Sequence, residues 1–523
     1  MKNLEGGNTG VSFFTPGSPV RPWVFSLLVV LALVVRLPSI LNFPQAFHTG
    51  RQYHNFLIAR GFYYEREGSG APEAEKAALV AARHYQEALE PPVLEWVTSR
   101  GYQWAGGEKT WIPRLLIALV WLLGTFFFYR LACEIASRDA ALFATGFYLL
   151  YPYGVLISTS FQPDPVMTVL VLISLDFQWR YAKAPSLGRL LLAAFLSGLA
   201  VLVKPLALFS VLGVFVCMTL ARVGFRQTLK KPDLYLFSAA ALIPSLAYYV
   251  YRIFTGGFLR AQWEMSFVPK FLLTAHFWRA WLAKLGIVIE FSAAAAALFG
   301  VFVARKGLPR AMLIGLWAGY FTLGLLFTFQ IHTHDYYQLS LIMAVPLSIA
   351  AFCDWLVRIA GEKFPAWRVV AMLLSLGLIG GAIYKTSVLH KVWRMEDFSS
   401  RVRAAEEIGG LTGHSAKTFF LSTASRYGKI LCFYGKIAGL HWPDEDQLVL
   451  EGFQGRKREP AGVRFKEMSA ILQPDYFIIT DRRQYEQQKD LKEFLTGRYP
   501  VLKETGDYLI FDLRKGEVRA DRH

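Results

Sequence analysis

The polar side chains that could carry out chemistry in this chain fall into four short groups that interrupt long apolar stretches. The first group lies in one polar segment and consists of His48, Arg51, Gln52 and His54, followed by Glu90 and Glu95. Arginine binds phosphate well, and imidazole or carboxylate groups can take up a proton near neutral pH. Loops often hold sites, so this segment is a candidate functional site. The alternative is a juxtamembrane helix whose charges meet only water and lipid headgroups.

The second and third groups each place one charge at the end of an apolar span. Asp164 lies between Pro163 and Pro165 at the start of a span, and Lys204 precedes Pro205 between two spans. Polar residues at membrane depth are costly, which favours a function for both. Asp164 could instead cap a helix N-terminus, and Lys204 could extend its amine to the membrane interface or meet a lipid phosphate.

The fourth group is the run from His332 to Gln338, with His334, Asp335, Tyr336 and Tyr337 as candidates for substrate binding. Its His-x-His-Asp pattern could ligate a divalent cation, but the spacing offers no fourth ligand. No sequence feature requires a metal or another cofactor. The two tyrosines could also belong to an aromatic belt at the membrane surface.

The elements that position these groups are predicted to be transmembrane helices. Of the 523 residues, 54% are hydrophobic and only 18% are charged, and the mean hydropathy is +0.33. Apolar runs of about 20 residues recur about eleven times, which predicts a polytopic α-helical membrane protein. The spans are expected near 22–42, 112–132, 140–158, 165–181, 188–203, 206–222, 234–253, 284–304, 311–329, 339–357 and 367–385.

Basic residues are distributed unevenly between the links that join these spans. Alternate links contain clusters of lysine and arginine, for example Arg180, Lys183 and Arg189. In the short links of the opposite set, Lys204 is the one lysine or arginine. Since cytoplasmic links carry the excess of basic residues, the N-terminus is predicted in the cytoplasm and all four polar groups on the outer face. The net charge of +17 thus indicates membrane topology, and no nucleic acid partner is expected.

Two domains are predicted, a transmembrane domain (1–385) and an extracytoplasmic α/β domain (386–523). The transmembrane domain has two long outer loops, 43–110 and 254–283. The second is rich in aromatic and basic residues, which predicts an amphipathic segment at the membrane interface. In the tail, strands are expected at 417–422, 430–434 and 476–480, a helix at 397–411, and a hairpin formed by 499–502 and 508–513.

The order of the motifs resembles that of the GT-C membrane glycosyltransferases. The chain has Arg51-Gln52 in the first loop, then Trp111-Ile112-Pro113-Arg114-Leu115, Pro163-Asp164, Leu202-Val203-Lys204-Pro205 and His334-Asp335-Tyr336-Tyr337-Gln338-Leu339. Over about residues 20–385 this order is similar to that in the bacterial inner-membrane superfamily of protein O-mannosyltransferases and lipid A aminoarabinose transferases.

The resemblance implies transfer of a sugar from a polyprenyl-phosphate donor to a lipid, glycan or protein acceptor at the outer side of the cytoplasmic membrane, with inversion of the anomeric centre. It implies that Arg51, Gln52, Lys204, Tyr336 and Tyr337 bind the donor phosphate and that Asp164 is an acidic site residue. His334, Asp335 and Glu95 are further candidates for substrate contact.

The chain departs from the family at one position of the first loop. Many relatives have an aspartate shortly after Arg-Gln, whereas this chain continues Tyr53-His54-Asn55. His48, His54, Glu90 or Glu95 would have to take up the proton, with His48 ranked first, or the chain is a non-catalytic member. The alternatives to an enzyme are a secondary transporter, against which the absence of repeated halves argues, and a scaffold that binds lipid-linked sugars.

Overall fold

The computed structural model describes residues 14, 20–45, 47–66, 70–86, 90–255, 266–363, 366–392, 397–422, 428–453 and 457–516. The chain divides into two compact units, each of which is described by itself. Unit 1 consists of residues 1–42, 89–91 and 114–392, and unit 2 of residues 43–88, 92–113 and 393–523.

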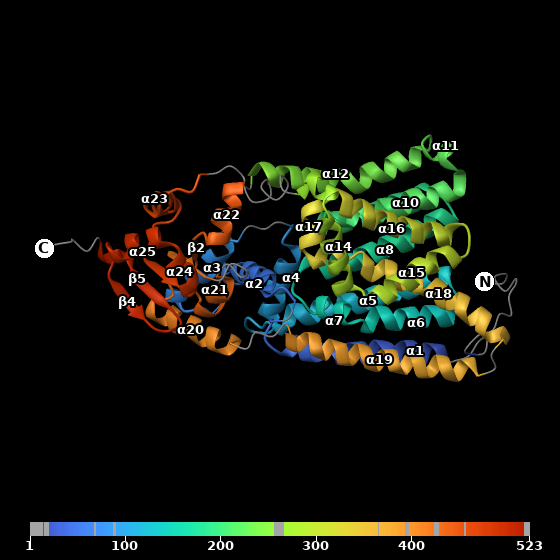
Figure 1. Ribbon diagram of the computed structural model, residues 1–523, viewed down its shortest axis with the longest axis horizontal. Helices are drawn as coiled ribbons and strands as arrows, with labels where there is room; N and C mark the ends of the chain where they lie inside the picture. The colour runs from blue at the N-terminus through green and yellow to red at the C-terminus, as the bar shows by residue number, and fades with distance from the viewer. Residues whose placement is uncertain are drawn as a thin grey trace. The chain divides into compact units, whose positions relative to one another are not determined.

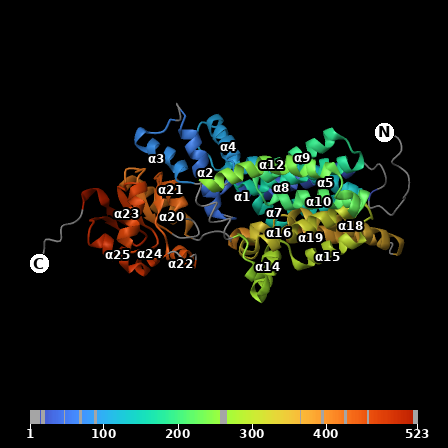
Figure 2. The same cartoon turned by 90° about the horizontal axis from the view of Figure 1, so that it is seen from above.

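Unit 1 is a helical bundle (Figures 1 and 2). Its first helices are α1 (Val20–Leu41), α5 (Trp111–Ile135), α6 (Arg138–Leu150), α7 (Pro152–Ile157), α8 (Pro163–Lys183), α9 (Leu187–Val203), α10 (Ala207–Val223), α11 (Phe225–Thr228) and α12 (Pro232–Thr255). They are followed by η1 (Pro269–Leu273), α14 (Ala275–Val288), α15 (Phe291–Val303), α16 (Leu308–Leu326), α17 (Thr328–Thr333), η2 (Asp335–Gln338), α18 (Leu341–Lys363) and α19 (Trp367–Val392).

Among the described residues, six helices are long and apolar enough to cross a membrane, or up to seven if a bent pair counts as one span. This finding confirms a multi-pass membrane protein, while the count of eleven spans stays a prediction. The predicted span 140–158 is divided at Tyr151–Pro152 into α6 and α7. The predicted span 284–304 is not one helix, because the chain bends by 93° between α14 and α15.

Two helices of unit 1 pack closely because glycines face each other. A Cβ atom on Gly213 of α10 would lie 2.5 Å from the carbonyl oxygen of Gly315 of α16, and one on Gly319 would lie 2.3 Å from that of Phe209. Small residues let helix backbones approach each other within a membrane, where packing provides much of the attraction. This contact fixes the start of α10, which follows Lys204.

Unit 2 combines the first loop with the tail. The loop forms α2 (Thr49–Tyr64), α3 (Glu73–His84) and α4 (Val93–Trp104). The tail contains α20 (Phe398–Leu411), β1 (Thr418–Leu421), α21 (Lys429–Gly435), β2 (Gly439–His441), α22 (Glu445–Phe453), α23 (Ala461–Ile471), β3 (Tyr476–Ile479), α24 (Arg482–Gln487), α25 (Lys489–Thr496), β4 (Val501–Glu504), β5 (Leu509–Asp512) and η4 (Leu513–Lys515).

Helix α2 of the loop packs against α21 of the tail. The hydroxyl groups of Tyr53 and Tyr434 are 2.8 Å apart. Arg60 donates a hydrogen bond of 2.6 Å to the carbonyl oxygen of Phe433 and forms an ion pair of 3.0 Å with Glu108. A buried arginine needs such partners, because an unpaired charge away from water is strongly destabilising. The loop, which was expected to belong to the transmembrane domain, is thus grouped with the tail.

The strands of unit 2 form a five-stranded sheet in the order β2-β1-β3-β5-β4. Strand β1 is parallel to β2 and to β3, whereas β5 is antiparallel to β3 and β4. The alternating residues Phe419, Leu421, Phe477 and Ile479 belong to the core on one face of this sheet.

The strand predicted at 430–434 is wrong, because these residues belong to helix α21. A short apolar run has the same pattern in a buried helix as in a buried strand, and α21 is buried along most of its length. The strands predicted at 417–422 and 476–480, the helix at 397–411 and the hairpin agree with β1, β3, α20 and the β4–β5 pair.

Candidate active site

Three charged side chains from distant parts of unit 1 meet at one point. The Nζ atom of Lys204 lies 3.0 Å from Oδ1 of Asp164, and it lies 3.3 Å from Oε1 of Glu90. The same ammonium group lies 5.5 Å from the centre of the Tyr336 ring, over its face. The structure therefore brings together four of the predicted site residues, and we call Glu90, Asp164, Lys204 and Tyr336 the lysine cluster.

The ends of helices position the members of the lysine cluster. Asp164 is in the first turn of α8, where Pro163 starts the helix without losing a backbone hydrogen bond. Gln162, not Asp164, occupies the N-cap position, so the capping role considered for Asp164 is wrong. Lys204 follows the last residue of α9, and its extended backbone separates α9 from α10.

The two carboxylates differ in their access to solvent. The side chain of Asp164 is 0% exposed and that of Lys204 is 7% exposed, whereas the side chain of Glu90 is 23% exposed. A buried carboxylate requires a paired cation, and Lys204 provides it. Asp164 can therefore hold Lys204 in place, while Glu90 is the carboxylate that another molecule can reach.

Two buried arginines that sequence reasoning left without a role hold the turn before α8. Arg114 donates to the carbonyl oxygens of Thr159 at 3.1 Å and Asn42 at 2.5 Å. Arg36 donates to Oγ of Ser158 at 2.8 Å. An arginine inside an apolar span is itself a signal of function. Arg114 holds the backbone of the turn that leads into Asp164, and Arg36 holds the side chain of Ser158 in the same turn.

The fourth polar group forms α17 and η2. Gln338 donates to the carbonyl oxygen of Ile331 at 2.7 Å and accepts a hydrogen bond from Tyr320, which in turn accepts one from Trp281 at 2.7 Å. This buried chain of hydrogen bonds fixes η2, and with it the ring of Tyr336 beside Lys204.

The other predicted residues of this group lie beside the fixed turn. His334 is bonded through Nδ1 to Thr333 at 2.7 Å, and its ring centre lies 6.1 Å from that of Tyr337. Asp335 is buried. In the part of the chain that the structure describes, no group of three histidine, cysteine, aspartate or glutamate side chains is placed to hold a metal ion.

The remaining first-loop candidates belong to unit 2. Gln52 is buried and donates to the carbonyl oxygen of Phe47 at 3.0 Å, and His54 Nδ1 lies 3.1 Å from Oε1 of Gln86. Glu95 is buried in α4. Arg51 is in the first turn of α2 and acts electrostatically on Lys429. Of the first-loop candidates, only Glu90 belongs to the lysine cluster, whereas His48 belongs to unit 2.

The backbone just before α2 is strained. Phe47 has a φ angle of 58° and His48 one of 52°, a left-handed conformation that costs residues with a side chain of the order of 1–3 kcal/mol each. Strain of this kind clusters at functional sites, which keeps this turn among the candidates.

The basic links of unit 1 lie at the end opposite to the lysine cluster. Asp176 pairs with Arg130 and Arg180, and Asp354 pairs with Arg305 and Arg358. Helix α8 runs from Asp164 in its first turn to Lys183 at its end. At a rise of about 1.5 Å per residue, the length of this helix is close to the thickness of the hydrocarbon core. The lysine cluster and the basic link after α8 therefore lie at opposite ends of unit 1, and their placement on the outer and cytoplasmic sides stays a prediction.

Part of the chain matches a known family model. Residues 89–251 match the family model described as dolichyl-phosphate-mannose-protein mannosyltransferase, a segment that contains Glu90, Asp164 and Lys204. A search of curated proteins by sequence finds no match.

Solved structures of two proteins share the fold. The crystal structure of ArnT from Cupriavidus metallidurans in the apo state matches with 17% sequence identity and a TM-score of 0.60, over 94% of this chain and 98% of that chain. The crystal structure of ArnT bound to undecaprenyl phosphate matches with 16% identity and a TM-score of 0.61, over 95% of this chain and 98% of that chain. The archaeal oligosaccharyltransferase AglB from Archaeoglobus fulgidus, in complex with an inhibitory peptide and a dolichol-phosphate, matches at 12% identity with a TM-score of 0.52, over 92% and 73%. The family match and the shared fold confirm the resemblance to the GT-C membrane glycosyltransferases.

Proposed function

We propose that this protein transfers a sugar from a polyprenyl-phosphate donor to an acceptor at the outer side of the cytoplasmic membrane. The observation that carries the proposal is the lysine cluster, in which one ammonium group meets one buried carboxylate and one accessible carboxylate. The family match over residues 89–251 supports the reaction class. One structure shows ArnT bound to undecaprenyl phosphate, and another shows AglB in complex with a dolichol-phosphate. Both support a lipid phosphate as the leaving group.

In the proposed reaction, an acceptor hydroxyl oxygen attacks the anomeric carbon of the sugar. The bond between that carbon and the phosphate oxygen breaks, and its electron pair leaves with the polyprenyl phosphate. The acceptor proton passes to a carboxylate, for which we propose Glu90, because its side chain is accessible while that of Asp164 is not. Attack from the side opposite the leaving group inverts the anomeric centre.

The roles of the other residues follow from charge and burial. Lys204 stabilises the negative charge that develops on the leaving phosphate, since a fixed cation in a site of low polarity favours such charge. Asp164 positions Lys204, and Tyr336 covers the ammonium group. Arg51, Gln52 and Tyr337 are retained as proposed contacts of the donor phosphate, and His334, Asp335 and Glu95 as proposed substrate contacts.

This assignment changes the proposed base from His48 to Glu90. Glu90 is the first-loop carboxylate that the structure brings to Lys204, and its side chain is accessible to another molecule. Glu90 thereby takes the place of the aspartate that relatives have after Arg-Gln. His48 and His54 stay as the competing candidates.

The experiment is a transfer assay with purified protein, a polyprenyl-phosphate sugar and an acceptor extract. The wild-type protein is expected to consume the donor, and Asp164→Asn is expected to lower the rate at least about 100-fold, because Lys204 loses the group that orients it. The matched control is Asp176→Asn, which changes the same residue type at the other end of the same helix and should retain transfer per folded molecule. An unchanged rate in Asp164→Asn would show that the lysine cluster is not the active site.

A further inference from the structure

A cavity in the tail lies at the carboxyl ends of two parallel strands. Ser422 directly follows β1 and Thr480 directly follows β3, and both line the cavity. From β1 the chain moves to β2 on one side, and it then crosses to β3 on the other side of β1. The connections therefore diverge between β1 and β3, and in open α/β sheets such a point forms a crevice where ligands bind.

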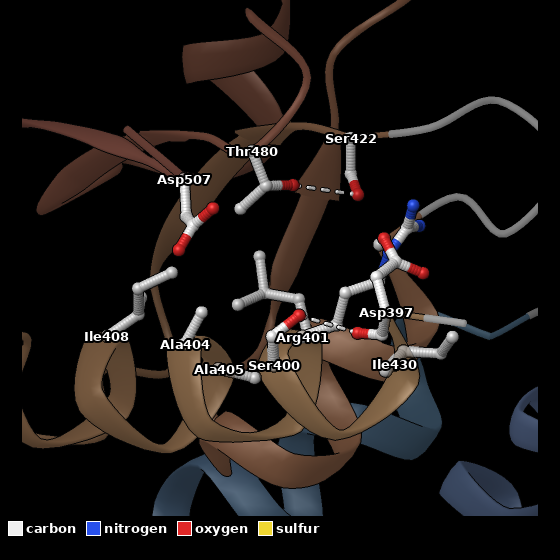
Figure 3. A pocket seen from close by; sticks show the side chains of 12 residues that line it. Asp397, Ser400, Arg401, Ala404, Ala405, Ile408, Ser422, Ile430, Thr480 and Asp507 are labelled. Atoms are coloured by element: carbon white, nitrogen blue, oxygen red, sulfur yellow. Dashed lines mark hydrogen bonds and ion pairs between the residues drawn. The ribbon is translucent and has the colours of Figure 1, made fainter. Parts of the chain in front are cut away.

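The cavity has a polar rim above an apolar floor (Figure 3). Helix α20 provides much of the floor with Ala404, Ala405 and Ile408, which face the strand ends across the gap. The rim is formed by the side chains of Asp397, Ser400, Arg401, Ser422, Thr480 and Asp507. A sugar ring has the same two properties, because its hydroxyl groups lie at the edge and its C–H groups form apolar faces.

The rim contains both hydrogen-bond donors and acceptors. The hydroxyl group of Thr480 donates to Oγ of Ser422 at 3.0 Å, and Arg401 pairs with Asp397. Within the described ranges, Asp507 forms no ion pair. The rim carries two carboxylates and one guanidinium group, so its net charge is negative and it disfavours phosphate or another anion.

The size of the cavity limits the ligand. Its volume is about 160 Å³. Since one water molecule needs about 10–15 Å³ of such space, the cavity has room for a ligand of about ten non-hydrogen atoms, which corresponds to one sugar ring.

We propose that this cavity binds one neutral sugar residue, with Asp507, Thr480 and Ser422 as hydrogen-bond partners of its hydroxyl groups. The site is separate from the lysine cluster, because all of its lining residues belong to unit 2. The proposal does not depend on transferase activity.

The test is a titration of the full-length protein in detergent, followed by ligand-observed saturation-transfer NMR. The probes are methyl α-mannopyranoside, methyl β-glucopyranoside and glucuronate. At least one neutral glycoside is expected to bind in a saturable manner, and glucuronate is expected to bind at least about tenfold more weakly, because its carboxylate meets the negative rim. Loss of hydrogen-bond partners in Asp507→Ala and Thr480→Val should each weaken binding about tenfold, which corresponds to about 1.4 kcal/mol.

Two controls separate this site from others. Glu493→Gln changes an exposed acidic residue on α25, which packs against the other face of the sheet, and it should leave the affinity unchanged. Asp164→Asn should also bind the glycoside like wild type, although it fails in the transfer assay. Absence of saturable binding for both glycosides, tighter binding of glucuronate, or equal affinity in all cavity variants would each overturn the proposal. Loss of binding in Asp164→Asn alone would place the sugar in the lysine cluster and overturn it as well.

Discussion

The ammonium group of Lys204 lies 3.0 Å from the carboxylate of Asp164, although the two residues are 40 positions apart in the chain. Each is buried, and each lies at the end of a helix. The pair therefore fixes the ends of α8 and α9 relative to each other, and it holds a positive charge where Glu90 can also reach it. Its contribution to stability and its contribution to catalysis can be measured separately.

The pair should show a strong coupling in stability. Removal of one partner leaves the other charge buried without compensation, so Lys204→Met and Asp164→Asn should each destabilise the protein by about 3–5 kcal/mol. The double variant Asp164→Asn/Lys204→Met leaves neither charge, and its loss should be well below the sum of the two single losses. Unfolding of the four proteins in one detergent measures this, and additive losses would show that the two residues do not interact.

The identity of the base can be tested by a matched set of substitutions. Glu90→Gln keeps the size of the side chain but cannot accept a proton, and we expect the turnover rate to fall about 100-fold or more. Glu90→Asp should retain part of the rate. His48→Gln, His54→Gln and Glu95→Gln should have smaller effects on turnover at saturating donor.

The comparison is made at equal amounts of folded protein, with turnover and the Michaelis constant measured separately. A larger fall in turnover for His48→Gln than for Glu90→Gln would return the role of base to the histidine at the strained turn.

Lys429 should make the stability of the protein depend on pH. Burial, followed by repulsion from Arg51, lowers the pKa of Lys429 to about 8, from an ordinary value of 10.5. The unfolded chain then binds this proton more tightly than the folded chain does, so the free energy of unfolding should rise between pH 8 and 10.5. Below pH 8 the full destabilisation caused by burying the charged amine is present. Lys429→Met should remove this rise and increase the melting temperature at pH 7.

The control for Lys429 is Lys417→Met, which changes an exposed lysine of the same sheet region. The control should keep the rise of the melting temperature with pH. If Lys429→Met and wild type show the same pH profile, the low pKa of Lys429 does not contribute to stability.

The topology can be tested with single cysteines and a thiol reagent that does not cross membranes. Ala105 is exposed in unit 2 after α4, and Ala184 is exposed in the basic link after α8. In intact cells we expect labelling of Ala105→Cys, whereas Ala184→Cys should be labelled only after the membrane is opened. The background replaces Cys133, Cys217, Cys353 and Cys432, which are all free thiols. The reverse pattern would place the lysine cluster on the cytoplasmic side.

The helices of unit 1 could be predicted well from sequence, because long apolar runs and basic links are direct consequences of the membrane. The same patterns placed Asp164 and Lys204 on one face. The approach of Glu90 to Lys204 could not be predicted, because it joins residues 114 positions apart and depends on where the loop returns to the bundle.

Two further errors have similar causes. The run from Ile430 to Tyr434 was predicted as a strand, since burial on all sides removes the periodicity that distinguishes helix from strand. Arg114 was recognised as part of a motif, but its acceptors are backbone carbonyl groups, which every residue carries and which no sequence pattern reveals.

The contact between the first loop and the tail has a consequence for synthesis of the protein. Tyr53 meets Tyr434 across 381 positions of the chain, so at about 5–20 residues per second the ribosome needs about 20–75 s to supply the partner after the loop has been made. During this interval the apolar and charged surface of α2 around Arg60 has no tail to cover it. The first loop therefore exposes this surface until the tail has been made, and loss of the tail would make that exposure permanent.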